Sequence, residues 1–272
     1  DILTNKYRIM IILDNHVSQA GWCCSNNDGN GLWYTNQYTT SDWIRLWKVI
    51  VTRYKDNKYV VGCDLRNELR QDTINGKKIS PTWGDNNNQT DWRLAAINVA
   101  NNILSVNPSL LMIVEGIDYA LNLKGVYSHP ITNSDLIIPN KLLYSAHDYS
   151  WSQSANSYNS FQQTMGNNWG YILKQNQVYT APVWVGEFGE CHYNTNNCLN
   201  SNWWEYIREY LTNADIDWGY WAIDGTESEG QGRTYGNEET FGVLNMTWNG
   251  YASIKLVNHL QMIMNKTQGP GK

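Results

Sequence analysis

The sequence predicts an α/β fold in which a parallel sheet is flanked by helices. Short apolar runs rich in β-branched residues recur along the 272 residues. They are continuous rather than alternating, as in strands that are buried on both faces. Between them, apolar residues recur at the 3.6-residue spacing of amphipathic helices. Strands that alternate with helices favour βα units over separate all-β and all-α parts.

Six apolar runs are predicted to be strands, and five helices are predicted between and after them. The strands are expected at 7–13, 60–65, 110–114, 141–146, 182–185 and 218–223. The helices are expected at 43–54, 92–103, 161–172, 203–211 and 251–264. Ser41 is the expected N-cap of the first helix, because a serine hydroxyl can accept a bond from an unpaired N–H of the first turn.

The number of units indicates an incomplete barrel. A closed (β/α)8 barrel needs eight strand–helix units, and an open arc of six would leave two unpaired sheet edges. No linker or composition break divides the chain, so residues 1–272 are expected to form one barrel domain that lacks the first two units. We expect a second polypeptide to supply them, joined by a disulfide to an unpaired cysteine, unless they are absent from the sequence.

Bulk composition argues against two classes of partner. The formal net charge is −5 and no run of Lys and Arg occurs, so nucleic-acid binding is not expected. No stretch of 18 apolar residues occurs, so no membrane-spanning helix is expected. The 14 tryptophans either fill the core or offer flat faces that stack on sugar rings.

Five cysteines and three acceptor sequences for N-glycosylation favour a secreted protein. Cys191 and Cys198 bracket a short polar loop and are predicted to pair, while Cys23, Cys24 and Cys63 leave at least one sulfur unpaired. The cysteine spacing matches no four-ligand zinc pattern, and no metal is expected. The glycosylation acceptors, each of which could occur by chance, are Asn88, Asn245 and Asn265.

Two glutamates directly follow predicted strands. Glu68 follows the second strand, and Glu187 ends the fifth between glycines that permit close approach of a substrate. Barrel enzymes keep their chemistry at the C-terminal ends of strands, and two carboxylates there can cleave a glycosidic bond. The alternatives are a Glu68 that pairs with Arg66 or Arg70 at an ordinary junction, and a Glu187 that is a solvated loop residue.

Other strand ends carry groups suited to sugar chemistry. His147 and Tyr149 are two residues apart on an extended segment and therefore point to the same side. A tyrosine hydroxyl can orient a carboxylate, and an imidazole can bond a sugar hydroxyl. His16 follows the first strand and Trp221 lies in the last one. The alternatives are a hydrogen-bonded structural histidine and a tryptophan of the barrel core.

Taken together, these segments resemble glycoside hydrolase family 5, the cellulase family of retaining (β/α)8 enzymes. The matching segments, for strands three, four, six, seven and eight, are Ile12-Leu13-Asp14-Asn15-His16, Leu65-Arg66-Asn67-Glu68, Ser145-Ala146-His147-Asp148-Tyr149, Val185-Gly186-Glu187-Phe188-Gly189 and Gly219-Tyr220-Trp221. Residues 21–31 resemble the eukaryotic, plant-like branch, and the resemblance runs from about residue 7 to about residue 260.

The resemblance implies a role for each matching residue. Glu68 would be the acid/base and Glu187 the nucleophile, with their carboxyl groups about 5 Å apart. Asn67 would bond the sugar 2-hydroxyl, and His147 and Tyr149 would line the reacting subsite, with Tyr149 near Glu187.

The remaining expected contacts are with further sugar rings and hydroxyls. His16 would bond substrate hydroxyls and Trp221 would form a sugar platform, while Trp22 and Trp151 are expected to be platforms at the barrel mouth. An arginine that the family carries near the end of its second strand is absent here. Without it Glu187 would lose a stabilising positive charge, unless a partner chain supplies one.

The predicted function is that of a secreted retaining glycoside hydrolase, endo-β-1,4-glucanase-like, that binds β-glucan and uses no cofactor. Family members that act on mannan, xyloglucan or glycolipid share the same catalytic residues, so the substrate stays open. The alternative from another class is a carbohydrate-binding or storage protein that keeps the barrel without turnover.

Overall fold

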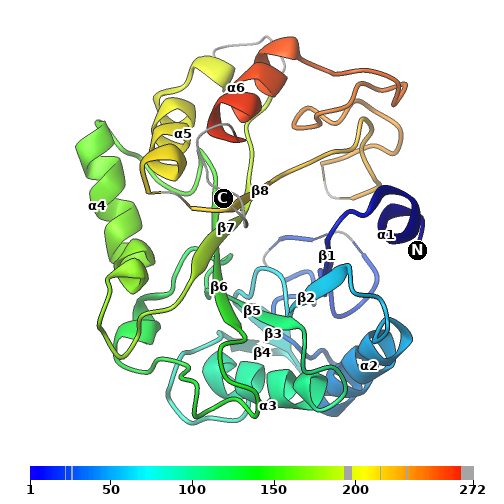
Figure 1. Cartoon of the computed structure of the whole chain (residues 1–272), viewed down its shortest axis with the longest axis vertical. Helices are drawn as coiled ribbons and strands as arrows, with labels where there is room; N and C mark the ends of the chain where they lie inside the picture. The colour runs from blue at the N-terminus through cyan, green and yellow to red at the C-terminus, as the bar shows by residue number, and fades with distance from the viewer. Residues whose placement is uncertain (22, 26, 193–197, 215, 231, 265–272) are drawn as a thin grey trace. The chain divides into compact units, whose positions relative to one another are not determined.

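The computed structural model describes residues 1–21, 23–25, 27–192, 198–214, 216–230 and 232–264. The chain forms two compact units. The first contains residues 1–145 and 171–182, and the second contains residues 146–170 and those from 183 onward. Figure 1 traces the chain from its N-terminal helix to α6.

The first unit is built on parallel strands in the order β1-β2-β5-β6. They are β1 (Ile11–Asp14), β2 (Val60–Asp64), β5 (Leu111–Glu115) and β6 (Leu142–Asp148), whose last three residues belong to the second unit. The register pairs Asp14 with Asp64 and Glu115 with Ser145. Because parallel strands share a direction, their carboxyl ends meet at one edge and carry several acidic groups there.

Helices α2 (Thr40–Arg53) and α3 (Trp92–Leu104) cover the strands of this unit and lie beside one another (Figure 1). A capping box starts α2, since Thr39 and Asp42 each accept a bond from the other's backbone N–H. The indoles of Trp43 and Trp47 both donate to the carbonyl oxygen of Leu65, at 3.2 Å each, which fixes the helix to the segment after β2. The other elements of this unit are α1 (Ile2–Tyr7), β3 (Asp72–Ile74), β4 (Lys77–Ile79) and η1 (Lys124–Tyr127).

The second unit packs helices α4 (Tyr158–Asn168), α5 (Asn202–Ala214) and α6 (Ile254–Met264) around a short parallel pair of strands. In this pair, Val185 of β7 (Val183–Phe188) lies opposite Trp218 of β8 (Trp218–Tyr220). Its core is aromatic: the ring of Phe188 on β7 stacks on that of Trp204 on α5. The Trp204 indole also donates to His259 of α6 at 2.9 Å, which joins the last two helices. The remaining elements are η3 (Cys198–Asn200) and η2 (Gly170–Leu173); Gly170 of η2 belongs to this unit and the other residues of η2 belong to the first.

The first predicted strand, 7–13, is wrong at its start. Residues 2–7 form a helix that ends where Arg8 adopts a left-handed φ of 56°, and the strand begins only at Ile11. The N-cap of α2 is Thr39 rather than Ser41. The hairpin β3–β4 has no counterpart among the predicted elements.

The predicted pair Cys191–Cys198 is present in the structure, and one of the other three cysteines stays unpaired, as expected. Cys191 pairs with Cys198, and the neighbours Cys23 and Cys24 pair with each other, which leaves Cys63 as the free thiol. Cys63 lies in β2 with no exposed surface, and burial raises the pKa of its thiol to about 12. The one sulfur left for an interchain disulfide is therefore buried, and the structure gives no support to such a link.

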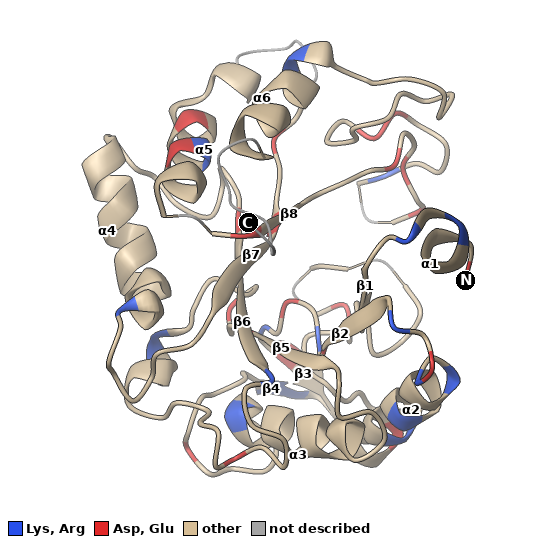
Figure 2. Cartoon of the chain, viewed as in Figure 1, with Lys and Arg blue, Asp and Glu red and all other residues tan. Residues whose placement is uncertain are grey.

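Charge and apolarity are distributed along the elements without long blocks. Figure 2 shows acidic and basic residues together on α5, and the sequence of this helix contains Glu205, Arg208 and Glu209. Over the described part of the chain, no helix combines the length and apolarity that a bilayer crossing requires.

Candidate active site

Glu68 is held in an uncommon backbone conformation within the first unit. It follows β2 by four residues and has a φ of 46°, in the left-handed region that non-glycine residues rarely occupy. Its N–H donates to Oε2 of Glu115 at 2.7 Å, and its carbonyl oxygen accepts a bond from Nη1 of Arg70 at 2.8 Å. Both peptide groups that flank the Glu68 side chain are thus bound by charged groups.

Two buried arginines stabilise the loop around Glu68. Arg66 donates to the carbonyl oxygens of His16 and Asn67, at 2.8 and 2.7 Å, and burial, followed by the charge of Arg70, lowers its pKa to about 10. Arg70 forms an ion pair with Asp28 at 2.5 Å. These bonds engage the guanidinium groups with loop carbonyls and with Asp28, so both arginines have structural roles.

Asn67 and His16 lie in the same unit as Glu68. Asn67 is buried, and its amide donates to the sulfur of Cys23 at 3.5 Å. His16 follows β1, and its Nδ1 lies 2.8 Å from Oδ2 of Asp14. The carboxylate of Asp14 thereby orients the imidazole.

Glu187 lies near the end of β7 in the second unit and has two of the predicted neighbours beside it. The hydroxyl of Tyr149 donates to Oε1 of Glu187 at 2.5 Å, and Nδ1 of His147 lies 4.0 Å from Oε2. His147 and Tyr149 flank the end of β6 and are both buried. A short bond from a tyrosine hydroxyl favours the ionised form of a carboxylate and fixes its orientation.

Asp148 lies between these two residues, and its side chain is bound on the other side of the strand. Its carboxylate accepts bonds from the Trp203 indole at 2.7 Å and from the Gln153 amide at 2.9 Å. Burial raises the pKa of Asp148 to about 7, against the opposing effect of these hydrogen bonds. Because successive side chains of a strand point to opposite sides, Asp148 lies on the side away from Glu187, whereas His147 and Tyr149 face Glu187.

The predicted aromatic platforms have three different outcomes. Trp151 is 69% exposed, and its ring stacks on Tyr149 with centroids 4.4 Å apart, while Phe241 meets it edge-on. Trp221 directly follows β8 and is half-buried, and its backbone N–H donates to the carbonyl oxygen of Phe188 at 2.9 Å. Trp22 lies outside the described residues.

Gly189, two residues after Glu187, occupies a position that requires a glycine. A Cβ on Gly189 would collide with the carbonyl oxygen of Trp221, so the segment after β7 can approach the segment after β8 only if this position lacks a side chain. The glycine that follows Glu187 in the sequence pattern therefore allows a close backbone contact.

The glycosylation acceptors lie in different surroundings. Asn88 is exposed in the loop before α3. Asn245 is half-buried, and its Oδ1 accepts a bond from the Thr247 hydroxyl at 2.9 Å. Asn265 lies outside the described residues.

Two acidic residues near the candidate groups were not predicted. Glu115 is the last residue of β5, so the strand-then-carboxylate pattern that identified the other glutamates also applies to it. Asp148 lies inside the motif that contains His147 and Tyr149, but an isolated pattern does not reveal which acid is buried.

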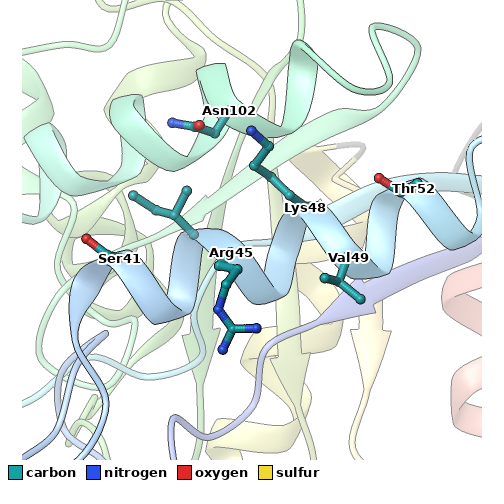
Figure 3. A pocket seen from close by; sticks show the side chains of 7 residues that line it. Ser41, Arg45, Lys48, Val49, Thr52 and Asn102 are labelled. Atoms are coloured by element: carbon teal, nitrogen blue, oxygen red, sulfur yellow. The ribbon is translucent and has the colours of Figure 1, made fainter.

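A groove on the outside of the first unit is separate from these groups. Figure 3 shows that it lies along α2, with Asn102 of α3 on its other side. The lining residues are Ser41, Ile44, Arg45, Lys48, Val49, Thr52 and Asn102. None of the predicted site residues lines this groove.

Comparison with known proteins identifies the family. The model of the family "Cellulase (glycosyl hydrolase family 5)" matches residues 4–227, well over half of the chain. The chain belongs to glycoside hydrolase family 5. This family 5 chain is 36% identical over 234 residues to an endoglucanase of Paenibacillus polymyxa, covering 79% of the chain and 54% of that protein.

A plant relative and a solved structure extend the comparison. A glycosyl hydrolase 5 family protein of Chamaecyparis obtusa is 29% identical over 276 residues, covering 96% of the chain and 46% of that protein. The endocellulase of Pyrococcus horikoshii superposes with a TM-score of 0.75 at 25% identity, over 95% of the chain and 70% of that structure. A variant of this archaeal enzyme has been solved with cellotetraose, and that structure superposes with a TM-score of 0.74 at 24% identity, over 94% of the chain and 70% of that structure.

The fold is that of the (β/α)8-barrel endocellulases, of which the chain supplies part. The chain spans about half the length of the curated relatives that it matches. These comparisons give no support for a second polypeptide.

Proposed function

We propose that this chain carries the catalytic residues of a retaining glycoside hydrolase that cleaves β-1,4-linked glucan in the manner of an endoglucanase. Family membership supports a glycosidase, and the endoglucanases among its relatives support glucan as the substrate class. The observation that carries the proposal is the 2.5 Å hydrogen bond from Tyr149 to Glu187. This bond fixes the orientation of Glu187 and favours the carboxylate form that a nucleophile needs.

The reaction has two steps. Glu187 attacks the anomeric carbon while Glu68 protonates the leaving glycosidic oxygen, which forms a covalent glycosyl-enzyme. Glu68, now a carboxylate, then removes a proton from water, which attacks the same carbon and releases the sugar with its original configuration. This mechanism requires the two carboxyl groups about 5 Å apart across one sugar.

Neighbouring groups would bind the sugar. Asn67 and His147 are proposed to bond hydroxyls of the reacting ring, His16 to bond hydroxyls of the same or the next ring, and Trp221 to form its platform. Trp151 is proposed as a further platform, because a large exposed face next to a buried tyrosine is available for stacking. We also propose that the protein is secreted, with exposed Asn88 as a glycosylation acceptor.

Leaving-group dependence tests the two assignments. In Glu68→Gln, kcat/KM for cellotetraose should fall by about 10²–10⁴-fold, whereas a dinitrophenyl β-cellobioside, whose leaving group needs no proton, should lose far less. Glu187→Gln should abolish turnover of both substrates. Glu209→Gln is a matched control, because this glutamate is exposed on α5. Equal losses for both substrates in Glu68→Gln would contradict the acid assignment.

Product analysis tests the remaining parts. Proton NMR of the first-formed product should show the β-anomer, as retention requires. Parallel assays on β-1,4-glucan, mannan, xyloglucan and a glucosylated lipid identify the preferred substrate. Binding of glucan without turnover by the unaltered protein would instead favour a carbohydrate-binding or storage role.

A further inference from the structure

We propose that Glu115 is a positioning residue for Glu68: its carboxylate holds the Glu68 backbone in the left-handed conformation from which the acid/base side chain acts. The inference rests on the proposed function. It assigns a role to a buried carboxylate that the two-step mechanism above does not use.

The conformation of Glu68 needs external support. A non-glycine residue in the left-handed region costs on the order of 1–3 kcal/mol and persists only where its surroundings impose it. Residues in this conformation cluster at functional sites. Glu68 adopts it with a φ of 46°. The support must come from groups that bind its two peptide units.

Glu115 provides this support on the N-terminal side. Its Oε2 accepts the Glu68 N–H at 2.7 Å, and the residue is 1% exposed. A bond from a backbone N–H to an ionised carboxylate is about twice as strong as a neutral one. The main chain of Glu115 is itself fixed, because its carbonyl oxygen accepts the Trp92 indole N–H at 2.8 Å. The carboxylate therefore extends from a rigid strand end.

Arg70 provides the support on the C-terminal side. Its Nη1 donates to the Glu68 carbonyl oxygen at 2.8 Å, while its other nitrogens bind Asp28 and the Ser25 carbonyl oxygen. With both peptide groups bound, the direction in which the Glu68 side chain leaves the backbone is set. Glu115 and Arg70 together form a clamp on the Glu68 backbone. Arg70 lies two residues from Glu68, whereas Glu115 ends strand β5 and therefore ties Glu68 to the sheet.

The role of Glu115 is distinguishable from general stabilisation. If Glu115 only stabilised the fold, its loss would slow all substrates alike, through a smaller amount of folded enzyme. If it positions Glu68, its loss should selectively slow substrates whose leaving group needs a proton. A displacement of about 1 Å at a catalytic group can cost about 100-fold in rate.

The test compares kcat/KM for cellotetraose and dinitrophenyl β-cellobioside in Glu115→Ala, in the full chain and with folding verified by circular dichroism. We expect a loss of about 100-fold for cellotetraose and a loss below about threefold for the aryl substrate. The matched control is Asp72→Ala, because Asp72 is an equally buried carboxylate that binds the Gly31 N–H at 2.7 Å. This control should slow both substrates equally.

Two conservative variants keep the test decisive if Glu115→Ala does not fold. Glu115→Gln keeps the length and an acceptor oxygen, whereas Glu115→Asp keeps the charge but falls short by one methylene. Positioning predicts a smaller difference between the two substrates for Gln than for Asp. Equal slowing of both substrates in Glu115→Ala, or in Glu115→Asp where Ala fails to fold, would overturn the inference while Glu68→Gln still shows its selective loss. If Glu68→Gln shows no selective loss, the proposed function fails, and the role of Glu115 fails with it.

Discussion

At the scale of single residues, Tyr149 is held at both its hydroxyl and its main chain. Its hydroxyl must reach Glu187 while its main chain turns away from β6. The turn is fixed by Ser152, whose hydroxyl donates to the Tyr149 carbonyl oxygen at 2.7 Å and whose N–H bonds the same oxygen at 3.0 Å. Trp151 covers the ring face. The ring is thus oriented by local contacts that precede any substrate.

Removal of the Tyr149 hydroxyl should therefore weaken catalysis more than folding. A hydrogen bond to a charged group is worth about 1.5–3 kcal/mol, so Tyr149→Phe should lower kcat/KM by about 10–100-fold while the ring stays stacked. Steady-state kinetics and thermal melts measure the two effects. A control is Tyr127→Phe, which changes an exposed tyrosine in the first unit. A kcat/KM unchanged within twofold would contradict the role of this bond.

Asp148 should make stability depend on pH in an unusual direction. Its pKa is raised by burial from 3.8 to about 7, so the folded state favours the protonated acid. This contribution to stability is fully present below pH 4 and is lost as the pH rises through 7; the difference is worth up to about 4 kcal/mol. Asp148→Asn should remove it, since an asparagine can pair with the Gln153 amide, whose buried Oε1 has no other bond.

Thermal melts between pH 4 and pH 8 measure this prediction. The melting temperature of Asp148→Asn should rise relative to that of the unaltered protein as the pH increases. The exposed Asp56→Asn should follow the unaltered protein at every pH. Parallel curves for the Asp148 variant and the unaltered protein would contradict the raised pKa.

At the scale of elements, the sequence predicted buried strands better than exposed ones. The runs around β2, β5, β6 and β7 are apolar and β-branched, so their positions are confirmed within a few residues. The hairpin β3–β4 was missed because its strands have three residues each and β4 begins with two lysines. The signal was Asn75-Gly76, whose φ values of 49° and 73° are those of a tight hairpin turn that this pair favours.

Candidate site residues were predictable where the pattern is local. A glutamate after an apolar run is visible in the sequence, and so are two residues on the same side of a strand. The clamp on Glu68 is not visible in the sequence. Glu115 is 47 residues away and meets Glu68 only in the folded chain, and Arg70, two residues away, must turn its side chain back to the Glu68 carbonyl oxygen. No spacing rule encodes a bond between the end of one strand and the loop after another.

Asp91 should be the most important cap among the helices of the first unit. As the N-cap of α3 it accepts bonds from the N–H groups of Leu94, Gly84 and Asn86, at 3.2, 3.0 and 2.8 Å. A cap alone is worth about 1 kcal/mol, and the two loop bonds add to it. Asp91→Ala should lower the free energy of unfolding by about 2 kcal/mol.

Urea unfolding measures the effect of this cap. Asp91→Asn should lose less than Asp91→Ala, because an amide oxygen can still accept a bond. An exposed control, Asp56→Ala, should stay within about 0.5 kcal/mol of the unaltered protein. A loss in Asp91→Ala no larger than in this control would contradict the cap.

At the scale of the whole molecule, the chain passes between its two compact units three times, after residues 145, 170 and 182. The first passage lies inside β6, so residues 142–145 pair within the first unit and residues 146–148 lead into the second. Neither unit is a continuous piece of sequence. A cut between the units would divide a strand, so we predict that residues 1–272 unfold as one cooperative domain.

Hydrogen exchange in mild urea tests this cooperativity. Asp91→Ala, in the first unit, should accelerate exchange of the slowest amides by about 30-fold, which corresponds to about 2 kcal/mol. In a single cooperative domain, the amides of α5 in the second unit should accelerate as much as those of α3. Leu211→Ala, which removes a fully buried side chain from α5, provides the reciprocal test on α3. If amide exchange accelerated only in the unit that carries each substitution, the two units would unfold separately. The strand that they share would then not couple them, and the prediction of one cooperative domain would be wrong.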